Sequence, residues 1–289
     1  MPIALNVMCY LCESVDGREV FVEDGVALRR CADCGHVYST WSQDEHYSGY
    51  WDQGIPDTDL SFWDDAHRPI YNQFIDRYLG APTGRLVDVG CGLGFFVAAV
   101  ARDRPRWQCD GYELAAPPVA WAHDHGLADS VHQGLVQEAG IEPGSVDVIC
   151  LWDVIEHLTH PQDLLNAVHD LLAPGGFVFL QTPNWPFQYA KARATVIKDR
   201  GVIAGKHYLA AKDHVNQFSR QSLTSLALDC GYGEPEFNVL LPISAVGGRR
   251  SRPGELVKTG IYQATRTLWR LSGRRAMANP TLFAFLRPA

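Results

Sequence analysis

The stretch LVDVGCGLGFF, residues 86–96, joins a short apolar strand to a glycine-rich turn and then to the start of a helix. Its three glycines allow the backbone to turn sharply and a ligand to approach it closely. The helix that follows offers unpaired N–H groups at its start. Glu113 ends the next strand, 19 residues beyond Gly94, where an acid can accept both ribose hydroxyls of an adenosine-type cofactor. The stretch therefore predicts a cofactor site at the end of a buried strand.

Strands and helices alternate from Arg85 onward, and the strands are almost continuously apolar. This pattern is typical of an α/β fold, in which helices cover both faces of a parallel sheet. The expected strands are residues 85–90, 107–113, 129–134, 145–153, 177–184, 234–244 and 279–288. The expected helices, with their terminating glycines or prolines, are residues 66–80, 95–105, 116–126, 161–176, 219–233 and 259–273.

Four cysteines form two pairs near the N-terminus, Cys9 with Cys12 and Cys31 with Cys34. In a reducing compartment such pairs indicate a metal site or a redox motif rather than a disulfide framework. The spacing matches a structural zinc site, whose four thiolates close the shell and leave no position for catalysis. Neither pair has the strand-to-helix context of a redox motif. We therefore expect residues 1–42 to form a zinc ribbon, with two unlinked buried pairs as the alternative.

The region from Arg85 to the C-terminus resembles the class I S-adenosylmethionine (SAM)-dependent methyltransferases. The matching segments are DVGCGLG from Asp88, GYEL around Glu113, VDVICLWDVIEHLTHP from Val146 and LLAPGGFVFLQTPN from Leu171. The resemblance implies a Rossmann-like sheet of seven strands whose last strand runs antiparallel. It also implies SAM as the cofactor and methyl transfer as the reaction.

This resemblance divides the rest of the chain into expected parts. Residues 43–84 become an aromatic linker and helix that lead into the core. Residues 85–289 become the methyltransferase domain, with a lid segment at 185–216 that covers the acceptor and an insertion at 245–278. The insertion includes a basic, amphipathic helix that could cover the acceptor, pack against a second subunit or lie on an anionic membrane surface.

The resemblance also implies a role for each matching position. The glycine turn and Asp88 would lie beside the methionine part of SAM, Glu113 would bind the ribose, and Leu114 would flank the adenine. The segment after the third strand would contact the adenine ring, and the segment after the fourth would line the substrate side. The implied cofactor-binding residues are Asp88, Gly90, Cys91, Gly92, Gly94, Phe95, Glu113, Leu114, Gly134, Leu135, Val136, Trp152, Asp153 and Val154.

Two histidines are candidates for a catalytic base. His157, in VIEHL, follows the fourth strand, near the edge where ligands bind in such sheets. His214 matches a histidine of related chains in the pattern HxxxFS, and the lid segment also contains His207. Imidazole can remove a hydroxyl proton near neutral pH, so we expect His157 or His214 to deprotonate the acceptor. The alternative for His157 is a capping or backbone-bonding role.

The segment RCADCGHVYSTWSQDEHYSGYW, residues 30–51, is similar to the zinc-ribbon front end of small-molecule methyltransferases, including sugar C-methyltransferases. In these proteins an aromatic stretch after the ribbon approaches the cofactor pocket. This implies a cofactor contact for Tyr50 and acceptor contacts for Tyr47, Trp51 and His207, with core packing of the aromatic residues as the alternative. The extra C-terminal domain of the sugar C-methyltransferases is absent from this sequence, which favours O-methylation.

Charge is distributed unevenly along the chain. The formal net charge is −8, yet residues 187–289 contain 16 basic and 6 acidic residues. The basic region is either a solvated surface or faces an anionic partner, such as a phosphate on a carrier-linked or nucleotide-linked acceptor. The acidic first part argues against a nucleic-acid partner over the whole molecule. The N-terminus resembles no signal peptide and no apolar run could span a membrane, so we expect a cytoplasmic protein.

Several functions remain open at this point. The first is O-methylation of a small molecule, such as a sugar, nucleotide sugar or natural-product intermediate. A quinone-pathway O-methyltransferase is a further alternative, because DVIEHL and LLAPGG are also similar to that group. The second is a ribosomal RNA base methyltransferase that recognises RNA through its ribbon, and the third is a SAM-binding protein without turnover.

Overall fold

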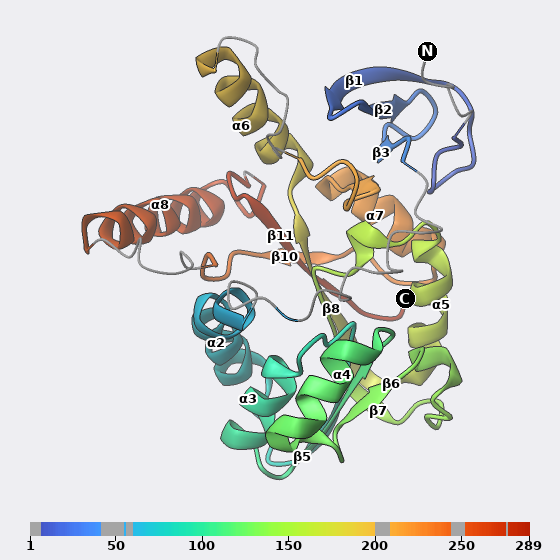
Figure 1. The fold of residues 1–289 in the computed structure, drawn as a ribbon, viewed down its shortest axis with the longest axis vertical. Coiled ribbons are helices and arrows are strands. Elements are labelled where there is room, and N and C mark those ends of the chain that lie inside the picture. The colour runs from blue at the N-terminus through green and yellow to red at the C-terminus, as the bar shows by residue number, and fades with distance from the viewer. Residues whose placement is uncertain (1–6, 42–54, 56–59, 200–208, 244–251, 276) are drawn as a thin grey trace.

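The computed structural model describes residues 7–41, 55, 60–199, 209–243, 252–275 and 277–289 (Figure 1). These residues form one sheet of seven strands and one of four, together with helices and short helical turns labelled η. The elements, in chain order, are β1 (Gly17–Glu23), β2 (Val26–Cys31), β3 (Val37–Ser39), η1 (Ser61–Ala66), α2 (Arg68–Tyr78), β4 (Gly84–Val89), α3 (Phe95–Asp103), β5 (Trp107–Glu113), α4 (Ala116–Ala122), η2 (His123–Leu127), β6 (Val131–Gln133), η3 (Val136–Glu138), β7 (Val146–Trp152), η4 (Ile155–His157), α5 (Pro161–Leu171), β8 (Leu172–Pro183), α6 (Trp185–Lys198), β9 (Asn216–Gln217), α7 (Arg220–Asp229), β10 (Glu236–Asn238), α8 (Arg252–Leu271) and β11 (Thr281–Leu286).

The larger sheet has the strand order β10-β11-β8-β7-β4-β5-β6. Strand β4 pairs in parallel with β5 and β7, and β7 pairs in parallel with β8. Strand β11 runs antiparallel to both of its neighbours, β8 and β10. The predicted Rossmann-like sheet of seven strands with an antiparallel last strand is therefore confirmed.

Helices cover both faces of this sheet. Val87 and Ile149 belong to an apolar cluster that includes residues of α5 and α7, whereas Leu86 and Val148 belong to a second cluster with residues of α2 and α3. Figure 1 shows these two groups of helices on opposite sides of the sheet. Because successive strand residues point to opposite faces, burial on both sides explains why β4 and β7 are almost continuously apolar.

The smaller sheet has the strand order β1-β2-β3-β9. Cys9 and Cys12 precede β1, Cys31 ends β2, and Cys34 lies between β2 and β3. Its edge strand β9 comes from the second half of the chain, between α6 and α7. Val37 lies opposite Gln217, and Tyr38 lies opposite Asn216. The N-terminal segment and the region after β8 therefore share one sheet rather than meeting only through side chains.

Buried polar contacts strengthen this connection. The His36 ring and Asn216 Oδ1 are 2.9 Å apart, and Asn216 Nδ2 donates to the Leu158 carbonyl at 2.6 Å. Burial, partly offset by the Asn216 contact, lowers the pKa of His36 to about 4, so the ring is neutral at physiological pH. Glu23 of β1 is also buried and accepts the N–H of Ala211 at 2.7 Å.

Three elements differ from the sequence expectations. Helix α6 occupies the start of the expected lid segment, where the sequence predicted no helix. Strand β8 begins at Leu172, so helix α5 ends before the Pro-Gly-Gly run at 174–176. This run bulges out between the pairings of Leu172 and Phe177 with β7, and Gly175 has positive φ, 84°. Strand β10 has only three residues, because Val239 and those after it leave the sheet edge.

Helix α8 packs only part of its surface against the core. Tyr262 and Trp269 join the larger apolar cluster, whereas Ile261, Leu268 and Leu271 are exposed. Among the helices that the structure describes, none is both long and apolar enough to cross a membrane.

Candidate active site

The glycine turn between β4 and α3 uses its glycines for two different reasons. Gly90, Gly92 and Gly94 all have positive φ, at 69°, 53° and 74°. A Cβ on Gly90 would lie 2.7 Å from Val154 Cγ2, and one on Gly94 would lie 2.8 Å from Leu127 Cδ1. A Cβ on Gly92 would meet no atom within 4 Å. Close packing thus requires glycine at 90 and 94, while Gly92 leaves open space beside the turn.

Glu113 at the end of β5 is held against this turn. Its Oε2 accepts the N–H of Gly92 at 3.0 Å, and its Oε1 accepts the N–H of Ala115 at 2.9 Å. Two backbone donors therefore fix the carboxylate beside the glycine turn. A carboxylate oxygen can accept more than one hydrogen bond, so both oxygens retain acceptor capacity for ligand hydroxyls.

Asp88 lies beneath the turn and is almost fully buried. Its Oδ1 has no hydrogen-bond partner among the residues that the structure describes. Burial, with a further contribution from the nearby Glu113 charge, raises the pKa of this carboxyl well above its usual value. A buried polar group without a partner costs free energy, and a cationic or hydrogen-bonding ligand group would relieve that cost.

Two apolar side chains are exposed beyond the ends of β5 and β6. Leu114 is 57% exposed and Leu135 is 43% exposed, and the side-chain amide of Gln133 donates to the Leu114 carbonyl at 3.4 Å. Gly134 has φ 131° and open space beside it. Val136, by contrast, is buried in the core cluster.

The other predicted cofactor residues surround the turn but differ in exposure. The Cys91 side chain packs against Gly111 of β5, where a Cβ would approach Cys91 Sγ to 2.7 Å. The Phe95 ring contacts Trp121 at a centroid distance of 5.2 Å. Trp152 is buried and packs edge-on against Tyr71 at 4.9 Å, so its ring is part of the core.

Asp153 directly follows β7 and has positive φ, 51°, which is uncommon for a residue other than glycine. Its Oδ2 accepts a hydrogen bond from Gln181 Nε2 at 2.6 Å and lies 3.8 Å from His67 Nε2. His67 is fully buried and stacks on Trp63 at 4.6 Å. Our sequence analysis missed His67 and Gln181, because a single histidine between two helical segments and a glutamine in a strand carry no motif.

The two candidate bases lie together. The His157 and His214 rings meet edge-on at a centroid distance of 4.9 Å, and His157 Nδ1 lies 2.8 Å from the Asp213 carbonyl oxygen. Glu156 is fully buried beside them, and ligand atoms of all three residues lie within 4.8 Å of one another. Burial, with a further contribution from Asp153, raises the pKa of Glu156 well above its usual value. The structure thus brings two distant histidines into one polar cluster.

The remaining predicted contacts, Tyr47, Tyr50, Trp51 and His207, lie outside the described residues.

The four cysteine thiols form a compact group. Cys9 Sγ and Cys34 Sγ are 3.5 Å apart, as are Cys12 Sγ and Cys31 Sγ, and all four sulfurs lie within 4.8 Å of one another. None of them forms a disulfide. Zinc–sulfur bonds of about 2.3 Å in a tetrahedron place the sulfurs about 3.8 Å apart. The donor set and its size therefore fit a zinc ion with a closed shell.

A family model described as a methyltransferase domain matches residues 62–233. The chain belongs to the family of SAM-dependent methyltransferases. The matched range contains the glycine turn, Glu113 and the histidine cluster. The orphaned oxygen of Asp88, the open space at Gly92 and the oriented Glu113 carboxylate fit the SAM cofactor that the family implies.

Curated relatives of this methyltransferase include O-methyltransferases. It is 32% identical over 140 residues to a ubiquinone biosynthesis O-methyltransferase of Xanthomonas campestris pv. campestris (strain B100), which covers 47% of this chain and 56% of that protein. A protein of the same name from Sodalis glossinidius is 36% identical over 122 residues, or 40% of this chain and 48% of that protein. The chain thus spans about half the length of the curated relatives that it matches.

Solved structures of low identity share the fold. An N-methyltransferase from Haemonchus contortus, solved with phosphomonomethylethanolamine and S-adenosylhomocysteine, superimposes with a TM-score of 0.57 at 18% identity, covering 85% of this chain and 60% of that chain. The PH0226 protein from Pyrococcus horikoshii OT3 gives a TM-score of 0.52 at 10% identity, covering 86% of this chain and 100% of that chain. At these identities the likeness concerns the fold alone.

Proposed function

We propose that this methyltransferase methylates a hydroxyl group of a small-molecule acceptor, with a histidine as the general base. When bound, SAM supplies an electrophilic methyl group on a sulfonium sulfur. A hydroxyl oxygen becomes a strong nucleophile only as its proton is removed, and imidazole accepts protons near neutral pH. The curated relatives are named O-methyltransferases, which supports a hydroxyl as the acceptor group.

The contact between His157 and the Asp213 carbonyl carries this proposal. A carbonyl oxygen can only accept, so Nδ1 is the donor and holds the proton of the neutral ring. The basic lone pair is then on Nε2, and the same hydrogen bond fixes the orientation of the ring. His157 lies three residues after Val154, and Val154 packs against Gly90 of the cofactor turn. We therefore assign the base role to His157, with His214 as the neighbouring candidate.

The remaining side chains would position the reactants. Asp88 would receive the amino group of the cofactor, Glu113 the ribose hydroxyls, and Leu114 with Leu135 the two sides of the adenine. The backbone around Trp152 would line the substrate side. Buried surroundings of this kind exclude water, which would otherwise compete with the acceptor.

We also propose that Cys9, Cys12, Cys31 and Cys34 hold a structural Zn²⁺. The support is the compact group of four sulfurs and the absence of any disulfide among them. Four thiolates fill the coordination shell, so the metal would stabilise the N-terminal sheet and take no part in methyl transfer.

A quinone-type phenol is the second candidate acceptor, favoured by the name of the curated relatives. Sugars and nucleotide sugars remain the first candidate acceptors, because the ribbon resembles that of small-molecule methyltransferases that act on sugars. An RNA acceptor is less well supported, because β9 of the same chain covers the β3 edge of the small sheet.

Isotope-labelled SAM tests these assignments. The full-length protein is incubated with catechol-type phenols, sugars, nucleotide sugars or ribosomal RNA, and products are analysed by mass spectrometry for a methyl ether. Transfer to a small-molecule hydroxyl supports the proposal. Methylation of RNA alone would overturn it, as would tight SAM binding without turnover on any acceptor.

A further inference from the structure

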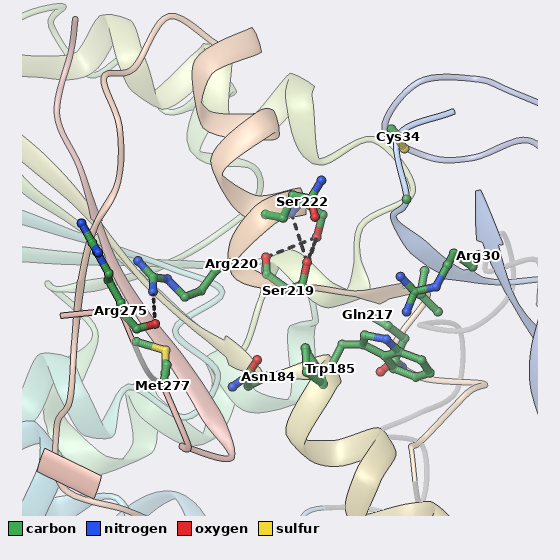
Figure 2. A pocket seen from close by; sticks show the side chains of 14 residues that line it. Arg30, Cys34, Asn184, Trp185, Gln217, Ser219, Arg220, Ser222, Arg275 and Met277 are labelled. Carbon is green, nitrogen blue, oxygen red and sulfur yellow. Dashed lines mark hydrogen bonds between the residues drawn. The ribbon is translucent and has the colours of Figure 1, made fainter. Parts of the chain in front are cut away.

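A cavity lies between the small sheet and the start of α7 (Figure 2). Its volume is about 350 Å³, at the small end of the range of about 300–1,000 Å³ typical of ligand pockets. Four parts of the chain line it: the β2–β3 region, the start of α6, the β9–α7 junction and residues near Arg275. The cavity is therefore formed only when the N-terminal segment and the methyltransferase region meet.

The lining of this pocket is strongly cationic. Arg30, Arg220 and Arg275 line it, and none of the described lining residues is acidic. No ion pair joins any of these three arginines to a carboxylate in the part of the chain that the structure describes, although the neighbouring Arg274 pairs with Glu236 at 3.2 Å. Figure 2 shows Arg220 and Arg275 on one side of the pocket and Arg30 on the other. Three unneutralised guanidinium groups in a chain of net charge −8 point to an anionic ligand.

Arg220 is held in place before any ligand arrives. Its guanidinium lies over the Phe237 and Trp269 rings, at 4.7 and 5.2 Å from their centroids, and donates to the Arg275 carbonyl at 2.9 Å. Burial lowers the pKa of Arg220, consistent with partial desolvation of the cation. A fixed planar guanidinium suits the oxygens of phosphate, because little side-chain entropy is lost on binding.

The start of α7 adds backbone donors to the arginines. Ser219 caps this 10-residue helix and accepts the N–H of Ser222. The N–H groups of Arg220 and Gln221 come earlier in the first turn, where a helix offers no internal acceptor. Both residues line the pocket. Free N–H groups and the positive end of the helix dipole favour a bound anion at this position.

We propose that this pocket binds the phosphate or diphosphate group of the methyl acceptor, which places the acceptor among phosphorylated or nucleotide-linked compounds. This inference rests on the proposed methyltransferase function. Gln217 lines the pocket and follows His214 by three residues, a span of at most about 11 Å in extended chain. Gln217 Nε2 also donates to the His214 carbonyl at 3.2 Å. An anion in the pocket would thus be anchored close to the histidine cluster, and Arg30 would make the ribbon part of the acceptor site.

Calorimetric titration of the full-length, zinc-loaded protein with inorganic pyrophosphate tests the pocket. Arg30→Gln and Arg220→Gln should each weaken binding at least about tenfold, the effect expected for losing a charge-assisted hydrogen bond. Arg287→Gln is the matched control, because Arg287 also lies over an aromatic ring, Phe177 at 5.0 Å, but outside the pocket. Arg30→Gln keeps the test valid if Arg220→Gln fails to fold.

Three results would overturn the proposal: no pyrophosphate binding to the wild type, wild-type affinity in both pocket variants, or displacement of pyrophosphate by S-adenosylhomocysteine. Affinity for S-adenosylhomocysteine, measured separately, reports on the cofactor site, so failure of the pocket and failure of the methyltransferase function are distinguishable. In the labelled-SAM assay, turnover should be lost when a phosphorylated acceptor is first treated with phosphatase or phosphodiesterase. Turnover confined to unphosphorylated acceptors would also overturn the proposal.

Discussion

His36, directly before β3, and Asn216 on β9 share a buried contact of 2.9 Å, although 180 residues separate them in the sequence. The same Asn216 side chain donates to the carbonyl of Leu158, directly after His157. One amide therefore connects the residue before β3 to the residue that follows the proposed base. Damage to this amide is expected to affect both stability and the site.

Asn216→Ala removes a partner from the His36 ring and from the Leu158 carbonyl. Because both groups are buried, we expect the free energy of unfolding to fall by about 2–3 kcal/mol. Urea denaturation at constant pH measures this change. Asn166→Ala on the exposed face of α5 is the matched control, and we expect it to remain within about 0.5 kcal/mol of the wild type. Equal effects of the two substitutions would contradict the role of Asn216.

Gly92→Ala tests the open space beside the cofactor turn. Gly126→Ala is the matched control. Gly126 has a φ of 87° and Gly92 has a φ of 53°, and a Cβ on either residue would meet no atom within 4 Å. Both alanines should therefore cost about 1–2 kcal/mol of stability through backbone strain. Only Gly92→Ala should weaken SAM binding, because its methyl group would project beside the turn. Calorimetric titration with SAM measures the difference, and equal affinities would show that the cofactor lies elsewhere.

Asp88→Asn should change the pH dependence of stability in the ligand-free protein. Burial holds the pKa of the folded-state carboxyl well above the ordinary value of 3.8, so the unfolded chain ionises first as the pH rises. The carboxyl therefore contributes fully to the stability of the folded protein at a pH below its ordinary pKa. This contribution is lost as the pH rises toward the folded-state pKa. The variant should gain stability relative to the wild type as the pH rises above about 4, measured by urea unfolding. A difference independent of pH would contradict the raised pKa.

His157→Ala should lower kcat by about 10²–10⁴-fold, the usual contribution of a general base, and leave SAM affinity unchanged. His160→Ala, an exposed histidine at the start of α5, is the control and should retain full turnover. If His157→Ala keeps wild-type kcat and His214→Ala does not, the base role belongs to His214. Full turnover by both variants would exclude both histidines as the general base.

Cys12→Ser should abolish zinc binding, because three thiolates and a hydroxyl make a poorer site than four thiolates. Metal analysis by mass spectrometry should find zinc in the wild type and in the control Cys230→Ser, whose sulfur lies outside the cluster. The melting temperature should fall, while affinity for SAM stays the same. Zinc loss that abolished SAM binding in a folded protein would contradict a purely structural metal.

The parts of the molecule that the sequence predicted are those encoded by contiguous residues. The strand, turn and helix around Gly92 form one segment, and Glu113 follows at the distance set by one helix and one strand. The same applies to β11, an apolar run in the C-terminal region. Local pattern and resemblance were sufficient there, because each element buries its own side chains in a predictable period.

Features that depend on distant partners were not predictable. Strand β9 has only two residues, so no periodicity reveals it, and its pairing with β3 exists only in the folded chain. Helix α6 buries only Trp185 and Ala192 and therefore lacks an amphipathic pattern. Arg30 and Arg220 lie 190 residues apart in sequence and meet at one pocket only because β9 joins the two regions.

The strand β9 also sets the order in which the protein can be completed during synthesis. The N-terminal sheet leaves the ribosome first, but its fourth strand lies about 180 residues downstream. At roughly 5–20 residues per second, the nascent β3 edge waits about 10–35 s before β9 is translated. Unpaired strand edges are prone to association with other chains. Early binding of the metal would keep the first three strands compact during that interval, so metal supply should influence the yield of newly made protein as well as its final stability.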